Sequence, residues 1–174
     1  MFQSIEEIDT AVRESVDAHT IADVKVGSFL SSGVDSSYVA SVLRPDKTFT
    51  VGFSAENFSE IDNAAELSKE LGIENVNEVL DPKECFNEFN KIQYIMDEPH
   101  SNPSIVPLYF LARLARQHVT VVLSGEGADE LFGGYDEYTD TPNMKKYKNL
   151  PAPAKAIADL VAKVAPSSRI GGLV

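Results

Sequence analysis

Segments with strand composition alternate with segments at helical spacing along most of this chain, and this alternation constrains the fold more than any other feature. The segments rich in β-branched and aromatic residues are 24–30, 48–54, 75–79 and 118–123. The helix-like stretches between them run through Val42, from Ile61 to Leu71, from Pro82 to about Met96, and onward from Pro103 and Pro107. Strands joined by helical crossovers pair in parallel. We therefore predict an α/β fold with a doubly wound, mostly parallel sheet and helices on both faces.

The character of the sequence changes at Thr139. Three lysines and two prolines precede an alanine-rich run of helical composition at 155–164. We predict two parts, residues 1–138 as the main domain and residues 139–174 as a short helical C-terminal appendage. The small residues after Ser167 lead us to expect that the chain stops part-way through a larger protein.

The net charge of the chain limits the classes of partner that it is expected to bind. The 27 acidic and 15 basic residues give a formal net charge of −12. Such a molecule repels phosphate backbones and anionic membranes, so we expect neither a nucleic acid nor a membrane as partner. A phosphate ligand would instead need local binding by backbone N–H groups, a helix N-terminus and a divalent cation.

The cysteine content and the hydropathy of the sequence indicate the cellular compartment in which the protein is expected. Cys85 is the only cysteine, so it can form neither an internal disulfide nor a multi-cysteine metal site. No stretch approaches the roughly 18 consecutive apolar residues of a membrane-spanning helix. We expect a soluble protein in the reducing environment of the cytoplasm.

Two loops that follow strands carry the chemistry. In the first, residues 30–37, small residues and serine hydroxyls can surround a phosphate at a helix N-terminus, and Asp35 can hold a cation. An ordinary turn with a helix cap would use the same residue types. In the second, residues 123–135, the acids Glu126, Asp129 and Glu130 lie close together, which favours a magnesium site over a merely solvated acidic loop.

Neither loop matches the sequence motif of two common nucleotide-binding folds, the Walker A loop and the glycine-rich dinucleotide-binding fingerprint. No Gly-Lys-Ser/Thr follows the first loop, and Gly125-Glu126-Gly127 lacks a third glycine. Residues 31–37 instead resemble the Ser-Gly-Gly-x-Asp-Ser signature of the N-type ATP pyrophosphatases, also called the PP-loop superfamily, with Ser32 in place of a glycine. Together with Val51-Gly52-Phe53 and residues 123–135, the chain resembles the synthetase domain of glutamine-hydrolysing asparagine synthetases over roughly residues 5–138.

This resemblance implies an adenine nucleotide alpha hydrolase-like fold and an amide-forming ligase that uses ATP and Mg²⁺. Such enzymes activate aspartate as β-aspartyl-adenylate with release of pyrophosphate, and ammonia then displaces AMP to give asparagine. The residues implied to bind pyrophosphate are Ser31, Ser32, Gly33, Asp35 and Ser36. Those implied to surround adenosine are Leu30, Val51, Ser124 and Gly125. Asp35 and Asp129 are implied to hold magnesium, and Glu126 to act as the catalytic acid or base.

Several alternatives stay open. The family places an acid near the pyrophosphate after the second strand, and either Glu60 or Asp62 could match it. A nucleotide-binding module or fragment without turnover, a β-lactam synthetase-like enzyme and another PP-loop enzyme are the competing functions; Glu126 favours the asparagine branch, since β-lactam synthetases have a tyrosine there. We expect the family's glutaminase domain to be missing from this chain, because Met1 is followed by Phe2 rather than the nucleophilic cysteine. A homo-oligomer is compatible with all of these functions.

Overall fold

The computed structural model describes residues 4–53, 60–98, 101–135 and 142–155. The chain divides into two compact units, residues 1–126 and 127–174. The boundary predicted near residue 138 from composition stays a prediction.

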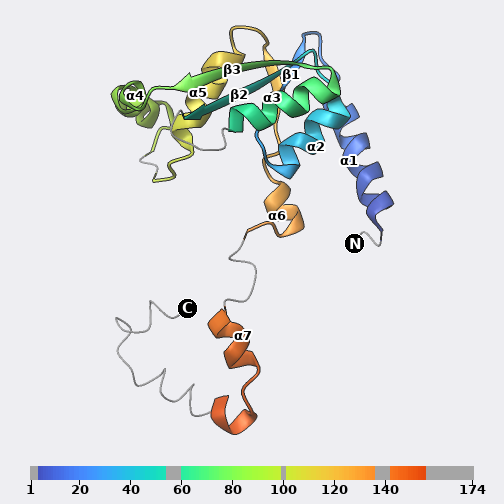
Figure 1. The fold of residues 1–174 in the computed structure, drawn as a ribbon, viewed down its shortest axis with the longest axis vertical. Helices are drawn as coiled ribbons and strands as arrows, with labels where there is room; N and C mark the ends of the chain where they lie inside the picture. The colour runs from blue at the N-terminus through green and yellow to red at the C-terminus, as the bar shows by residue number, and fades with distance from the viewer. Residues whose placement is uncertain (1–3, 54–59, 99–100, 136–141, 156–174) are drawn as a thin grey trace. The chain divides into compact units, whose positions relative to one another are not determined.

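Four strands form the sheet of the first unit, and all neighbours pair in parallel (Figure 1). In chain order they are β1 (Val26–Phe29), β2 (Lys47–Phe53), β3 (Glu74–Leu80) and β4 (Val121–Leu123). Their order across the sheet is β3-β2-β1-β4. Each strand lies within or close to a segment predicted from composition. The doubly wound parallel sheet is confirmed.

Five helices accompany these strands in the described part of the first unit (Figure 1). They are α1 (Ile5–His19), α2 (Val34–Leu43), α3 (Glu60–Leu71), α4 (Pro82–Ile95) and α5 (Ile105–Ala115). Helix α4 has an N-cap, because the Asp81 side chain accepts a hydrogen bond from the Lys83 N–H and Pro82 begins the helix as expected. Gly72, with φ of 71°, follows the end of α3 in the left-handed conformation that glycine adopts most easily.

Helix α1 was not predicted from the sequence, although a cap signal was present. The Ser4 hydroxyl accepts a hydrogen bond from the Glu7 N–H at 3.2 Å, which is half of a capping box. The helix is bound to α2 through the Tyr38 hydroxyl, which donates to the Asp9 carboxylate. Arg13 pairs with the same carboxylate at 2.8 Å. These bonds, chiefly that of Arg13, hold the pKa of Asp9 below its usual range.

One face of the sheet is covered by α4 and α5 and is apolar. Its buried cluster contains Phe49 and Val51 from β2, Cys85 and Ile92 from α4, and Phe110 and Leu114 from α5. Phe49 and Phe110 are fully buried. Burial of apolar side chains between helices and sheet is the main favourable contribution to folding, so this face supplies most of the core.

The opposite face of the sheet is covered by α2 and α3, which contact each other along the strands (Figure 1). Successive strand residues point to opposite faces, so Thr48 and Thr50 face away from Phe49 and Val51. Both threonines are buried, and Thr48 exchanges a hydrogen bond of 2.9 Å with Ser68 of α3. A small apolar cluster of Leu30, Ala40 and Ala64 completes this face.

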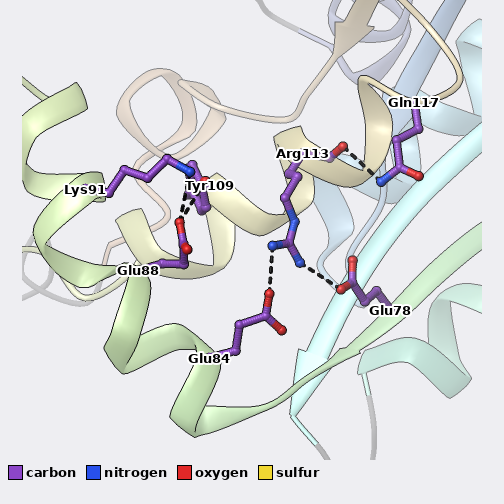
Figure 2. A network of polar contacts seen from close by, with 7 residues as sticks. All are labelled: Glu78, Glu84, Glu88, Lys91, Tyr109, Arg113 and Gln117. Carbon is purple, nitrogen blue, oxygen red and sulfur yellow. Dashed lines mark hydrogen bonds and ion pairs between the residues drawn. The ribbon is translucent and has the colours of Figure 1, made fainter.

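A polar network ties α5 to α4 and β3 at the edge of the apolar face (Figure 2). The Arg113 guanidinium donates to Glu84 at 2.7 Å and to Glu78 at 3.1 Å, and it lies 4.5 Å from the centre of the Phe110 ring. Tyr109 donates to Glu88, which also pairs with Lys91 at 3.0 Å. These contacts are spread over two helices and one strand, so Arg113 fixes how α5 lies across the sheet.

The strand predicted at 118–123 is too long. The His118 N–H and the Val119 N–H both donate to the Ala115 carbonyl, so these residues form the turn that ends α5. Pairing with β1 begins only at Val121. The β-branched residues around 119–120 fitted a strand by composition, but the carbonyls at the helix end compete for the same N–H groups.

The second unit includes the short helices α6 (Ala128–Phe132) and α7 (Pro142–Lys148), and residues 152–155 are also helical. Glycines in the left-handed conformation flank α6, Gly127 with φ of 90° and Gly133 with φ of 70°. The lysines noted in the sequence lie in the last turn of α7, where positive charge favours a helix C-terminus. Of the helical run predicted at 155–164, only Lys155 is among the described residues.

Candidate nucleotide-binding site

The candidate site lies where the strand order of the sheet reverses, between β1 and β4. The chain leaves β1 toward α2 on one face, and it reaches β4 from α5 on the other face. The two strands are in register, with Ser28 opposite Leu123, so the loops after them begin side by side. In open α/β sheets, this reversal at the carboxyl ends of the strands is where ligands bind.

The first loop is organised by its own hydroxyls. We call residues 31–37 the serine loop; it includes the first turn of α2. The hydroxyls of Ser31 and Ser36 lie 2.8 Å apart, and the Ser36 hydroxyl accepts from the Ser31 N–H at 3.1 Å. The Ser31 hydroxyl accepts from the Gly33 N–H at 3.1 Å, and Ser37 donates to the Gly33 carbonyl at 2.6 Å. These bonds bend the chain tightly over the N-terminus of α2.

The N-terminus of α2 has no side-chain cap. Its N-cap is Gly33, which has no side chain to accept from the first N–H groups of the helix. Ser32 and Gly33 are exposed, while Asp35 and Ser36 are half-buried in the first turn. The positive end of the helix dipole and unshielded N–H groups are the usual surroundings of a bound phosphate.

The second loop meets the first through a glycine. We call residues 124–126 the glycine segment. A Cβ atom on Gly125 would lie 2.7 Å from the Ser36 nitrogen and 2.9 Å from the Asp35 carbonyl carbon. Only glycine permits so close an approach of two backbones without a shift. The structure therefore brings together Asp35, Ser36 and Gly125, three of the residues predicted to bind nucleotide, and Ser124 adjoins them as a half-buried residue.

The side chains of Leu30 and Val51, both predicted to surround adenosine, lie in different clusters. Leu30 packs with Ala40 and Ala64 beneath α2 and α3. Val51 packs on the opposite face, in the cluster of α4 and α5. A shared side-chain surface of these two residues is therefore absent, and a contact from Val51 to adenosine would be made by its backbone.

The acids of the second loop have different surroundings. Glu126 is exposed at the end of the first unit. In the second unit, the Asp129 carbonyl accepts from the N–H groups of Gly133 and Gly134, at 2.8 and 3.0 Å. Glu130 accepts from the Tyr135 hydroxyl at 2.6 Å, and this bond holds the pKa of Glu130 below its usual range. Glu130 is thus already partnered.

A magnesium ion at this site would be bound by carboxylate side chains, and the candidate carboxylates are divided between the two units. Among the described residues, no three His, Cys, Asp or Glu side chains gather as a ready metal site. Magnesium at phosphate sites is commonly held by one or two carboxylates together with the phosphates themselves, so the half-buried Asp35 in the first turn of α2 fits such an ion. The pairing of Asp35 with Asp129 joins two units and stays a prediction.

Glu60 and Asp62 are exposed in the first turn of α3. Residues 54–59, which precede them, lie outside the described residues, so the choice between these two acids stays open. The same holds for a cap of this helix by Ser59.

Sequence reasoning missed Thr50, which bonds to the residue that precedes the serine loop. Its hydroxyl donates to the Leu30 carbonyl at 2.8 Å, although 20 residues separate the two in sequence. A signal was present, since Thr48 and Thr50 alternate with Phe49 and Val51 and so predict a polar face on this strand. The bonding partner could not be read from that alternation.

Comparison with known proteins identifies relatives of this chain. The family model described as asparagine synthase matches residues 7–170. An asparagine synthetase [glutamine-hydrolyzing] 1 of Bacillus subtilis is 46% identical over 96% of this chain and 27% of its own length. A putative asparagine synthetase [glutamine-hydrolyzing] of Mycobacterium tuberculosis is 42% identical over 95% of this chain and 26% of its own length. The chain thus spans about a quarter of the length of these relatives.

Solved structures with this fold include an NMN synthetase from Francisella tularensis, with a TM-score of 0.53 at 18% identity over 77% of this chain and 59% of that one. An NH3-dependent NAD synthetase from Campylobacter jejuni has a TM-score of 0.50 at 13% identity over 98% of this chain and 92% of that one. At such identities the likeness concerns the fold alone. In the described part of the chain, no helix has the length and apolar character needed to cross a bilayer.

The matched family model and the close relatives establish that this chain belongs to the asparagine synthase family.

Proposed function

We propose that this chain binds ATP with Mg²⁺ and forms the amide-synthesising site of an asparagine synthetase. The observation that carries the proposal is the approach of Gly125 to the Asp35 and Ser36 backbone. It places the serine loop and the glycine segment against each other at the reversal of the sheet, where both can contact one nucleotide. The family membership of the chain supports the same reaction.

The serine loop is proposed to hold the pyrophosphate portion of ATP. The residues proposed to contact it are Ser31, Ser32, Gly33, Asp35 and Ser36, and the positive end of α2 attracts phosphate charge. With a net charge of −12, the chain as a whole repels ATP, so these local contacts must outweigh the long-range field. Leu30, Ser124, Gly125 and the Val51 backbone are proposed to surround the adenosine.

The reaction proposed is activation of aspartate as β-aspartyl-adenylate, with pyrophosphate released, followed by attack of ammonia and loss of AMP. Magnesium, when bound, neutralises charge on the departing pyrophosphate. Asp35 and Asp129 are the proposed magnesium ligands. Glu126 is the proposed catalytic residue, because an exposed carboxylate in the glycine segment could take a proton from the attacking ammonia.

The proposal also includes the substrates, the cellular compartment and the place of glutamine hydrolysis. Aspartate and ammonia are the proposed small-molecule substrates, in a cytoplasmic enzyme. Glutamine hydrolysis, which the names of the relatives mention, is assigned to no described residue of this chain. Its proposed place is a separate part of the full-length protein.

Calorimetric titration of the chain with ATP, with and without Mg²⁺, tests the nucleotide site. We expect binding that depends on magnesium, and about tenfold weaker binding for Asp35→Asn, which keeps the size of the side chain but removes its charge. Release of pyrophosphate on addition of aspartate and ammonia tests the reaction. Absence of magnesium-dependent ATP binding by the wild-type chain would contradict the proposal.

A further inference from the structure

The peptide group between Leu30 and Ser31, where the chain leaves β1, is held from both sides. Its carbonyl oxygen accepts from the Thr50 hydroxyl at 2.8 Å. Its N–H donates to the Ser36 hydroxyl at 3.1 Å. Because the carbonyl and the N–H belong to one rigid plane, two hydroxyls on opposite sides fix the direction in which the serine loop begins.

Thr50 is itself held in one orientation. It is 2% exposed, and its oxygen accepts from the Asn75 side-chain N–H at 3.0 Å while its own proton goes to Leu30. Asn75 in turn accepts from Asn77 at 3.1 Å. A chain of hydrogen bonds therefore runs from the edge strand β3, through β2, to the base of the serine loop.

A second threonine on the same strand provides a natural comparison. Thr48 is fully buried on the same face and accepts from the other N–H of Asn75 at 3.1 Å. Its remaining partners are Ser68 at 2.9 Å and the Glu74 carbonyl at 3.4 Å, both away from the serine loop. Thr48 and Thr50 thus share burial, strand and the Asn75 partner, but only Thr50 bonds to the residue that begins the loop.

We propose that Thr50 is a positioning residue for nucleotide binding, acting through the Leu30 carbonyl on the serine loop. The inference rests on the proposed function of that loop. Without the Thr50 hydroxyl, the Leu30 carbonyl loses a buried partner and the peptide plane can rotate. The Ser31 N–H and the hydroxyl pair of Ser31 and Ser36 then leave the arrangement that binds phosphate.

The test compares Thr50→Val with Thr48→Val, each of which replaces a hydroxyl by a methyl of similar size. We expect Thr50→Val to weaken ATP binding in the presence of Mg²⁺ about tenfold, and Thr48→Val to change it by less than about threefold. Thr50→Ser, which restores the hydroxyl, should recover the affinity. Equal weakening by the two valine variants, or no recovery with serine, would overturn the proposal.

Amide hydrogen exchange of the free protein provides a measurement that needs no nucleotide. In Thr50→Val, the Ser31 N–H should exchange at least about tenfold faster than in Thr48→Val, because only the first variant releases its peptide plane. If Thr50→Val does not fold, the pair Thr50→Ala and Thr50→Ser repeats the comparison with smaller side chains. Unchanged Ser31 exchange overturns the inference. A wild-type chain that binds no ATP contradicts the proposed function instead, while the exchange result still decides whether Thr50 holds the loop.

Discussion

The two faces of the sheet are built from different chemistry, although they share the same strands. The face beneath α4 and α5 buries Phe49, Val51, Phe110 and other apolar side chains. The face beneath α2 and α3 buries hydroxyls of Ser28, Thr48, Thr50 and Ser68. Within the described ranges, no buried side-chain polar atom lacks a hydrogen-bond partner.

The contrast shows that one face of the sheet mainly stabilises the fold, whereas the other mainly fixes the geometry of the chain. Apolar contacts are favourable in many orientations, so the first face stabilises the molecule without specifying one loop position. Hydrogen bonds are directional, and an unsatisfied buried group is costly, so the second face allows few arrangements. The face that buries the hydroxyls supports the start of the serine loop through the bond from Thr50 to Leu30. The proposed nucleotide site requires the atoms of this loop to be held in fixed positions.

The largest expected effect belongs to the apolar face. Phe110→Ala should lower the free energy of unfolding by about 3–5 kcal/mol, because it leaves a cavity among fully buried side chains. The ATP affinity of the protein that remains folded should not change. Urea unfolding followed by circular dichroism measures the first effect, and titration corrected for the folded fraction measures the second. A large loss of affinity in the folded fraction would erase the distinction between the faces.

Two glycines form a matched pair for the next comparison. A Cβ on Gly27 would lie 2.7 Å from the Phe49 ring, and a Cβ on Gly125 would lie 2.7 Å from the Ser36 nitrogen. Both alanine variants should lose about 1–3 kcal/mol of stability through overpacking. Only Gly125→Ala should also abolish measurable ATP binding, since it pushes the serine loop from the glycine segment. Retained affinity in Gly125→Ala would remove the observation on which the proposed site depends.

A smaller effect is expected at the edge of the apolar face. Arg113→Met removes the bonds to Glu78 and Glu84 (Figure 2) but keeps much of the aliphatic packing. The free energy of unfolding should fall by about 1 kcal/mol, since the pairs are partly exposed. The loss should shrink in 1 M salt, which screens the wild-type pairs. Arg113→Lys, which retains charge but cannot bond two carboxylates in the same way, is the control. A loss that does not depend on salt would indicate packing as its cause.

The smallest effect concerns the attachment of α1 to α2. The pKa of Asp9 is lowered by Arg13 and then by Tyr38, so the stability it contributes is present above its ordinary pKa near 3.8 and is lost as the pH falls through the lower folded value. In Tyr38→Phe, one lowering contact is removed. The decrease in unfolding midpoint between pH 5 and pH 3 should therefore be slightly smaller than in the wild type. Urea unfolding at these two pH values measures the difference, and an identical decrease would show that Tyr38 has no such influence.

Local patterns in the sequence were sufficient for much of the fold. The β-rich composition around Phe49 and Val51, the proline and acid that follow Asp81 and the glycine at position 72 each involve neighbours within a few residues. Helix α1 was missed although its signals were local, a cap at Ser4 and apolar residues at helical spacing at Ile5, Ile8, Val12 and Val16. The excess length predicted for β4 has a different origin, since composition at Val119 does not reveal that the Ala115 carbonyl competes for its N–H.

For the candidate site, local sequence was enough to predict the residue types: a run of serines around Gly33, a nearby carboxylate at Asp35, and a glycine segment after the last strand. These follow from chain neighbours and from the conformations that each residue permits. The folded structure was needed to show that Gly125 touches Ser36, that Leu30 and Val51 face opposite sides, and that Thr50 holds the Leu30 carbonyl. Each of these joins residues on different elements, and their meeting depends on strand order and register, which the packing of the whole sheet selects.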